Sequence, residues 1–183
     1  HGPLVHDPAA FTPFLTVSDA AREWGVAVTS ASKAFNLAGF KCALMVAASD
    51  RTLAVLDGMY EEVTYRTSIL GFHASVAAFT HGDEWLDGAL AAITASSALL
   101  GDLLAEHLPE VRFRPPEASY LAWLDATGLG WGDDPAQRAL DVARVAVNPG
   151  LSFGTAGAGR MRLNLACHPD VLREAVRRLA AAR

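Results

Sequence analysis

Residues 29 to 41 read Thr-Ser-Ala-Ser-Lys-Ala-Phe-Asn-Leu-Ala-Gly-Phe-Lys, and this stretch decides the fold. It contains Lys33, which follows the apolar run Val26-Ala27-Val28. We expect this run to form a buried strand that ends in small hydroxyl residues. A lysine at such a strand end can lose the water around its ammonium group, which lowers the pKa of the amine toward the range of a Schiff-base lysine. The stretch therefore predicts a reactive lysine, although a single lysine after a strand is usually a surface residue.

A second informative stretch lies near the end of the chain. Residues 148 to 167 read Asn-Pro-Gly-Leu-Ser-Phe-Gly-Thr-Ala-Gly-Ala-Gly-Arg-Met-Arg-Leu-Asn-Leu-Ala-Cys. A glycine-rich loop leads here into an apolar strand that carries Arg160 and Arg162. We expect the glycines at positions 150 and 154 to shape the backbone of this loop rather than to contact a ligand.

Both stretches resemble segments of the fold-type I pyridoxal-phosphate (PLP) enzymes, the superfamily of class I and II aminotransferases. Around Lys33 the sequence is most similar to that of the cystathionine β-lyase or C–S lyase branch. The resemblance implies an α/β chain, the C-terminal part of a PLP-dependent transferase fold. Such a part would hold a portion of the large-domain mixed sheet and a small α+β C-terminal domain. It also implies that the N-terminal half of the same enzyme is missing.

The resemblance assigns the cofactor-binding residues. Lys33 would form the Schiff base with PLP and would take the Cα proton of the substrate as a general base. Ser30 matches a position whose hydroxyl contacts the cofactor phosphate, and Ser32 is a second candidate for that contact. Lys41 stands where many relatives have a phosphate-binding arginine, so it keeps the charge and loses the bidentate geometry. His1 would lie near the cofactor's phenolic oxygen, which places the start of this chain inside a functional motif.

For the substrate, the resemblance points to Arg162 as the residue that clamps the α-carboxylate. Arginine suits this role because its planar fork donates two parallel hydrogen bonds to a carboxylate. Arg160 lies two positions earlier on the same strand. The alternative is that Arg162 is an edge-strand arginine in a surface ion pair.

The function implied by the resemblance is PLP-dependent C–S β-lysis in amino-acid metabolism. Cystathionine or a related cysteine conjugate would yield a thiol, pyruvate and ammonia. The same residues would equally support an aminotransferase, because the fold does not select the reaction. A third possibility is an inactive fragment of either enzyme, and we expect the isolated chain to be incomplete as a catalyst. The family also implies a homodimer.

Bulk properties restrict the remaining classes. With 183 residues, 51% hydrophobic and 19% charged, the chain has the composition of a soluble globular protein. Its net charge of −5 gives no basic surface for nucleic acid or an anionic membrane. The uncharged run from Gly88 to Gly101 is too short to span a bilayer, and the first residues lack the pattern of a signal peptide.

Cys42 and Cys167 lie in apolar runs and are expected to be buried free thiols of a cytoplasmic protein. The histidines show no metal-ligand spacing, so we assign no metal.

We expect three parts: residues 1–82 as the remainder of the large PLP-binding domain, 83–109 as a linking helix, and 110–183 as the small C-terminal domain. The two apolar strands of the first part favour a sheet buried on both faces. Sequence patterns and end signals predict helices at 16–24, 49–67, 68–80, 83–107, 133–145 and 169–182, and strands at 26–30, 41–48, 111–114, 120–125 and 160–167.

Overall fold

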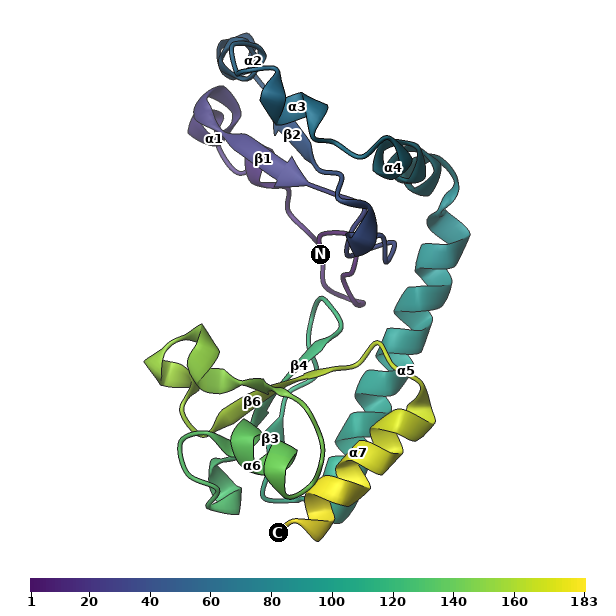
Figure 1. The fold of residues 1–183 in the computed structure, drawn as a ribbon, viewed down its shortest axis with the longest axis vertical. Helices are drawn as coiled ribbons and strands as arrows, with labels where there is room; N and C mark the ends of the chain where they lie inside the picture. The colour runs from purple at the N-terminus through teal and green to yellow at the C-terminus, as the bar shows by residue number, and fades with distance from the viewer. The chain divides into compact units, whose positions relative to one another are not determined.

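The computed structural model describes all residues from 1 to 183. It divides into two compact units, residues 1–89 and residues 90–183. The boundary lies inside the long helix α5 (Asp83–His107), whose two ends agree with the predicted helix (Figure 1). The assignment of residues 1–82 to a cofactor domain, 83–109 to a linking helix and 110–183 to a small domain stays a prediction.

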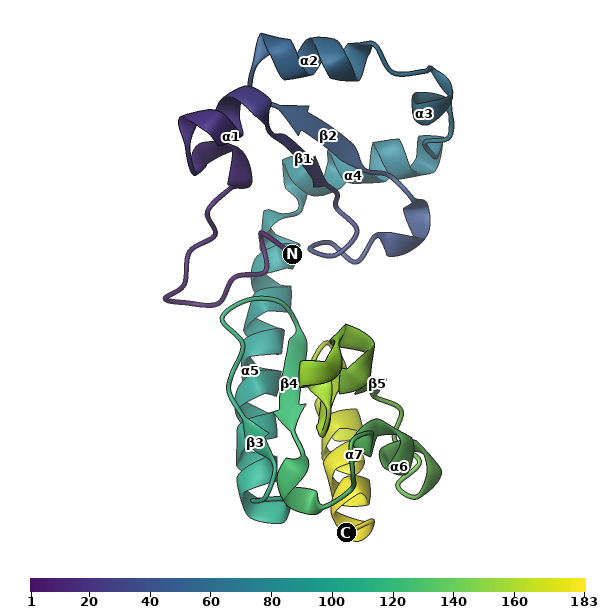
Figure 2. The same ribbon diagram turned by 90° about the vertical axis from the view of Figure 1, so that its left-hand side faces the viewer.

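The first unit contains a small sheet and several helices. Strands β1 (Val26–Thr29) and β2 (Leu44–Ala47) pair antiparallel, with Val26 opposite Ala47 (Figure 2). The helical elements are η1 (Phe14–Thr16), α1 (Asp19–Trp24), η2 (Ala38–Phe40), α2 (Asp50–Asp57), α3 (Glu62–Tyr65), α4 (Ile69–His81) and the first turns of α5.

The prediction that these two strands are buried on both faces is wrong for this chain. The exposed fraction is 69% for Val28, 43% for Met45 and 41% for Val46. The sheet has two strands only, so no further strand pairs with its edges. Apolar strands with open edges are normally covered by another element, and this composition is typical of strands that belong to a larger sheet.

The helix predicted at residues 16–24 ends at Trp24 as predicted but begins only at Asp19, after its cap. The Ser18 side chain accepts a hydrogen bond from the Ala21 amide at the start of α1. One predicted helix, residues 49–67, is wrong because it is two helices. Gly58 ends α2, and its amide donates to the carbonyl of Ala54. The sequence interpretation overlooked this glycine as a helix end.

The second unit is a four-stranded antiparallel sheet with helices on one face (Figures 1 and 2). The strand order is β3-β4-β6-β5. The strands are β3 (Arg112–Phe113), β4 (Leu121–Asp125), β5 (Asn148–Pro149) and β6 (Arg160–Asn164), and the helical elements are η3 (Thr127–Leu129), α6 (Pro135–Asp141), η4 (Gly150–Phe153), η5 (Thr155–Gly157) and α7 (Pro169–Ala181). The predictions missed only the short strand β5 among these strands.

The core of this unit lies between the sheet and helices α5 and α7. Alternate strand residues point into it, because successive side chains of a strand face opposite sides of the sheet. Residues at most 5% exposed include Ala122, Leu124, Met161 and Leu163 from the strands and Leu100, Leu104, Leu172, Val176 and Leu179 from the helices. The opposite face of the sheet carries Trp123, Arg160 and Arg162 instead.

Helix α5 is long and apolar enough, by length and composition, to cross a membrane. The prediction that it is too short to span a bilayer rested on the uncharged segment from Gly88 to Gly101 alone. Core helices of soluble proteins pass the same criterion, and this helix buries Ile93, Leu100 and Leu104 within the structure. The criterion is therefore weak evidence for a membrane span.

Helix α4 passes very close to the segment that carries Lys41. A Cβ atom on Gly71 would lie 2.3 Å from the Phe40 carbonyl oxygen and 3.0 Å from the Cys42 Cβ. The first contact involves backbone, so it cannot be relieved by turning a side chain. Gly71 thereby fixes the distance between α4 and the backbone next to Lys41.

We predict that Gly71→Ala destabilises the protein by about 1–3 kcal/mol, because the added methyl group forces α4 away from Phe40. Gly101→Ala is the matched control, since a Cβ there meets nothing within 4 Å. In the interior of α5 that control should be stabilising by up to about 1 kcal/mol. Urea denaturation of the full-length protein measures both free energies of unfolding. Equal effects of the two substitutions would contradict the close approach.

Candidate functional site

Lys33 lies in a tight turn that follows β1. Residues 31–35 form this turn, and the Phe35 amide donates to the Ala31 carbonyl at 3.0 Å. Asn36 has a φ of 55°, a left-handed conformation that asparagine tolerates and that ends the turn. Ala31 and Ala34 are 1% and 2% exposed. The turn is therefore held by its two alanines, which flank the lysine.

Phe35 attaches the turn to the junction of α4 and α5. Its ring meets the Phe79 ring edge-on, with centroids 5.6 Å apart, and the Trp85 ring at 6.2 Å. A Cβ on Gly82 would lie 2.6 Å from the Phe35 ring. Aromatic pairs at these distances add to the stability that burial provides. This small aromatic cluster fixes the backbone that carries Lys33.

The Lys33 side chain itself is exposed. The sequence analysis expected a desolvated amine after a buried strand, and that expectation fails because β1 is itself largely exposed. No hydrogen bond or ion pair joins the ammonium group to another part of the structure. The turn thus presents an unpaired primary amine on a fixed backbone.

The other predicted cofactor residues lie in the same unit. The Ser30 hydroxyl accepts a hydrogen bond from the Ser32 amide at 3.4 Å, so these two lie together. Lys41 follows η2 with a φ of 54° and is exposed. His1 is exposed, and its carbonyl accepts from the Leu4 amide.

This set of donors fits PLP, the cofactor that the sequence resemblance implies. An exposed primary amine such as Lys33 can condense with an aldehyde. An exposed lysine and two neighbouring hydroxyl groups can bind phosphate through charge and hydrogen bonds. The first unit therefore contains residues that suit both the aldehyde and the phosphate of the cofactor.

Arg162 occupies the centre of the open face of the sheet in the second unit. In the strand register it lies opposite Trp123 of β4 on one side and Asn148 of β5 on the other. Its Nη2 donates to Asn148 Oδ1 at 3.1 Å. Its Cζ lies 4.6 Å from the centre of the Phe153 ring, and Phe153 meets Trp123 edge-on at 5.5 Å. The Nε atom is buried and has no hydrogen-bond partner.

Arg160 lies on the same face of the sheet and has different interaction partners. Its Nη1 donates to the carbonyls of Ala156 and Ala158 at 2.6 and 3.2 Å. Its Nη2 lies 3.7 Å from Asp125 Oδ2. Arg160 therefore ties the glycine-rich loop to the sheet, and its terminal nitrogens are used within the protein. Arg162 makes a single hydrogen bond, to Asn148, whereas Arg160 makes two and also lies beside a carboxylate.

Trp123, Phe153 and Asn148 were not predicted as neighbours of Arg162. One signal could have identified Trp123. It alternates with Ala122 and Leu124, which are both fully buried, so it must point to the face opposite the core. Phe153 lies in a 3-10 turn, where no such periodicity applies.

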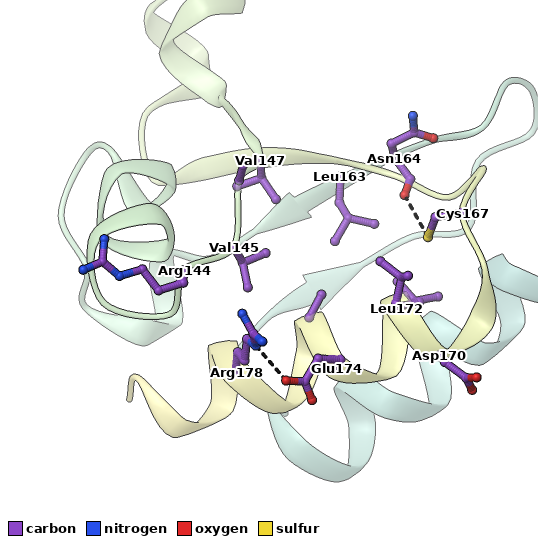
Figure 3. A pocket seen from close by; sticks show the side chains of 13 residues that line it. Arg144, Val145, Val147, Leu163, Asn164, Cys167, Asp170, Leu172, Glu174 and Arg178 are labelled. Atoms are coloured by element: carbon purple, nitrogen blue, oxygen red, sulfur yellow. Dashed lines mark hydrogen bonds and ion pairs between the residues drawn. The ribbon is translucent and has the colours of Figure 1, made fainter.

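A separate pocket of about 550 Å³ lies between the start of α7 and residues 144–147 (Figure 3). Its walls are mainly apolar, with Val145, Val147 and Leu163 pointing into it. An ion pair between Arg178 and Glu174 lies at its edge. It contains none of the predicted site residues. Arg162 alternates with Leu163 along β6 and therefore lies on the other face.

The cysteines differ in burial. Both are free, and Cys42 is buried as predicted. Cys167 is only partly buried, at the rim of the pocket, where loss of water raises the pKa of its thiol. The structure contains no group of three or more His, Cys, Asp or Glu side chains that could hold a metal ion.

Comparison with known proteins identifies relatives of the whole chain. The family "Aminotransferase class I and II" matches residues 1–179. A Mycobacterium tuberculosis protein, provisionally named cystathionine beta-lyase, is 43% identical and aligns with 98% of this chain and 48% of its own length. The cystathionine beta-lyase PatB of Bacillus subtilis is 32% identical over 93% of this chain and 45% of its own.

Solved structures show the same relationship. The crystal structure of a PLP-dependent beta-cystathionase from Corynebacterium diphtheriae, also a provisional name, matches with a TM-score of 0.92 and 32% identity. The match covers 100% of this chain and 48% of that one. The prediction of an α/β chain with the fold of PLP-dependent transferases is confirmed. The chain spans about half the length of the relatives it matches.

The ion pair of Arg160 yields a prediction about acid stability. Hydrogen bonds from the Thr127 hydroxyl and amide, at 2.6 and 3.1 Å, and the charge of Arg160 hold the pKa of Asp125 below its usual range. The folded state thus favours the carboxylate. This contribution to stability is complete above the carboxyl pKa of the unfolded chain, about 4, and is lost as the pH falls through the lower folded value.

We therefore expect Asp125→Asn to destabilise the full-length protein more at pH 7 than at pH 3. Urea denaturation at the two pH values measures the difference in unfolding free energy between the wild type and the variant. The difference should shrink at pH 3, where the wild-type carboxylate is increasingly protonated. A difference that stays constant would show that the pKa of Asp125 is not lowered by folding.

Proposed function

This chain belongs to the aminotransferase class I and II family, and we propose that the protein containing it is a PLP-dependent C–S β-lyase. Its substrate would be cystathionine or a related cysteine conjugate, and its products a thiol, pyruvate and ammonia. The observation that carries the proposal is the anchored turn that presents the unpaired Lys33 amine. The relatives named cystathionine beta-lyase favour the lyase within the family.

The chemistry that PLP supplies when bound is an electron sink for the charge that develops at the substrate Cα. In this proposal Lys33 holds the cofactor through its amine and, once released, takes the proton from Cα. Ser30, Ser32 and Lys41 hold the phosphate, and His1 lies near the phenolic oxygen. The exposure of Lys33 and Lys41 supports these roles, because both ammonium groups are accessible and unpaired.

Arg162 binds the substrate α-carboxylate in this proposal. Its terminal nitrogens make a single hydrogen bond, to a neutral amide, whereas Arg160 is tied to two carbonyls and is paired with Asp125. A bidentate pair with a carboxylate fixes both the position and the plane of the bound group. The clamp would thereby orient the Cα–H bond for proton removal.

We assign residues 1–82 to the large cofactor domain, 83–109 to a linking helix and 110–183 to the small domain. The division into compact units near residue 89 supports this assignment in outline. We further propose that the enzyme is a cytoplasmic homodimer. The exposed apolar strands β1 and β2 support the expectation that the isolated chain is incomplete, because such strands need cover.

An aminotransferase of amino acids is the second candidate. The observation that favours it is the family itself, whose description names aminotransferases. Lys33 and Arg162 would have the same contacts, and only the fate of the proton removed from Cα would differ. In a transferase the amino group passes to a 2-oxo acid, and no Cβ–S bond breaks.

The first test concerns Lys33. Borohydride treatment of the full-length holoenzyme should attach PLP permanently to a single peptide, the one that contains Lys33. Peptide mass spectrometry locates the adduct. Lys33→Ala should abolish the attachment because no other amine of the site forms the covalent bond. An adduct on Lys41 would contradict the assignment and require a different cofactor orientation.

The second test concerns reaction type and the carboxylate clamp. The wild-type enzyme should release pyruvate from L-cystathionine. Arg162→Ala should raise KM about 10- to 100-fold, because a hydrogen-bonded charge pair contributes about 1.5–3 kcal/mol. Arg173→Ala is the matched control, since Arg173 is an exposed arginine of α7. Amino transfer to a 2-oxo acid without pyruvate release from cystathionine would replace the lyase by the aminotransferase.

A further inference from the structure

The neighbours of Arg162 are arranged as a support for its guanidinium group. We propose that Asn148, Phe153 and Trp123 are positioning residues that fix Arg162 so that its terminal nitrogens face the substrate carboxylate. We call these three residues the arginine cradle. The inference rests on the proposed function, because it assumes that Arg162 binds a carboxylate.

The strand register places two members of the cradle beside Arg162. Trp123, Arg162 and Asn148 lie directly opposite one another on β4, β6 and β5. Residues directly opposite on neighbouring antiparallel strands share one face and have neighbouring side chains. Arg162 is therefore flanked on both sides before any ligand binds.

Asn148 contributes the one direct hydrogen bond to the guanidinium. Its Oδ1 accepts from Arg162 Nη2 at 3.1 Å, which uses one of the two protons on that nitrogen. An amide oxygen holds the cation without cancelling its charge. Asn148 thereby orients Arg162 while leaving it cationic for a carboxylate.

Phe153 and Trp123 restrict the position of the guanidinium. The Arg162 Cζ lies 4.6 Å from the centre of the Phe153 ring, within the range of a cation–π contact. Trp123 meets Phe153 edge-on and supports it from β4. The ring thereby occupies one side of the guanidinium, and a carboxylate has to approach from another side.

The buried Nε atom determines which edge of the Arg162 guanidinium a carboxylate can reach. Nε has no hydrogen-bond partner and is covered by protein, so a ligand cannot reach it in this arrangement. The terminal nitrogens Nη1 and Nη2 are then the donors for the carboxylate. An unsupported arginine side chain loses rotamer entropy when a ligand fixes it. The cradle removes much of that cost before binding.

A purely structural role for the Asn148 side chain is the main alternative. Strand β5 pairs with β6 through backbone groups, and these survive a change of side chain. The Asn148 amide has its hydrogen bond with Arg162. Substitution at this position therefore tests the cradle more cleanly than substitution of a buried residue.

The experiment measures ligand affinity rather than lyase turnover. Full-length holoenzyme is titrated with L-alanine, which has a carboxylate and no β-leaving group, and with ethylamine, its counterpart without the carboxylate. Binding is followed through the absorbance of the bound cofactor. Asn148→Ala should weaken L-alanine about tenfold and leave ethylamine unchanged, because only L-alanine uses Arg162. The surface amide Gln137, substituted as Gln137→Ala, is the matched control and should change neither affinity.

Two further variants separate positioning from packing. Asn148→Asp keeps the size of the side chain and the hydrogen bond but adds a carboxylate that competes for Arg162, so it should weaken L-alanine more than Asn148→Ala does. Phe153→Leu should weaken L-alanine about threefold through loss of the cation–π contact, whereas Phe153→Tyr should keep the affinity. If Asn148→Ala instead keeps wild-type affinity for L-alanine, the side chain does not position Arg162 and the proposal fails.

A double-mutant cycle gives the decisive measurement. In an Arg162→Ala background, Asn148→Ala should cause no further loss of L-alanine affinity, because the cradle acts only through Arg162. The same tenfold loss in both backgrounds would overturn the proposal. If the wild type binds L-alanine and ethylamine alike, both the clamp and the cradle are wrong. If it discriminates between them and the cycle behaves as expected, but cystathionine is not cleaved, the cradle stands and only the lyase function fails.

Discussion

The alternation of side chains along β6 is the constraint on which the candidate substrate site depends. Met161 and Leu163 point into the core, so Arg160 and Arg162 must lie on the opposite face. A slip of one residue in the pairing would bury two cations and expose two large apolar side chains. The cost of a buried, unpaired charge is high, so burial of the core alone specifies which residues face a ligand.

The lysine turn of the first unit depends on a different kind of contact. Its strand gives little support, because β1 is largely exposed. Phe35 supplies the support through its contacts with Phe79 and Trp85, and Gly82 leaves room for the ring. An aromatic anchor two residues from the lysine fixes the backbone and leaves the amine accessible.

Local signals made much of the fold predictable, and non-local contacts explain the failures. The long helix from Asp83 to His107 was predicted to the residue, since an apolar stripe ends at a proline. Capping is decided within three residues, and the side chains of Ser18 and Asp134 accept hydrogen bonds from the Ala21 and Gln137 amides at the starts of α1 and α6. The open faces of β1 and β2 were not predictable, since burial depends on strands that the sequence pattern implies and this chain does not contain. Similarly, the motif pointed to Arg162, but its contact with Phe153 depends on how a glycine-rich loop folds back.

The two arginines of β6 show why residue type alone does not assign a role. They lie on one strand and one face, two positions apart, and the sequence offered both near the predicted carboxylate site. Arg160 donates to two loop carbonyls and lies beside Asp125, so it stabilises the fold and its charge is paired. Arg162 instead has an amide oxygen, an aromatic face and a buried Nε around it. These neighbours restrict its orientation without neutralising its charge, and a cation in that condition is suited to bind an anion from outside the chain. The division of labour between the two residues therefore arises from the loop that Arg160 holds, because that loop carries Phe153 to Arg162.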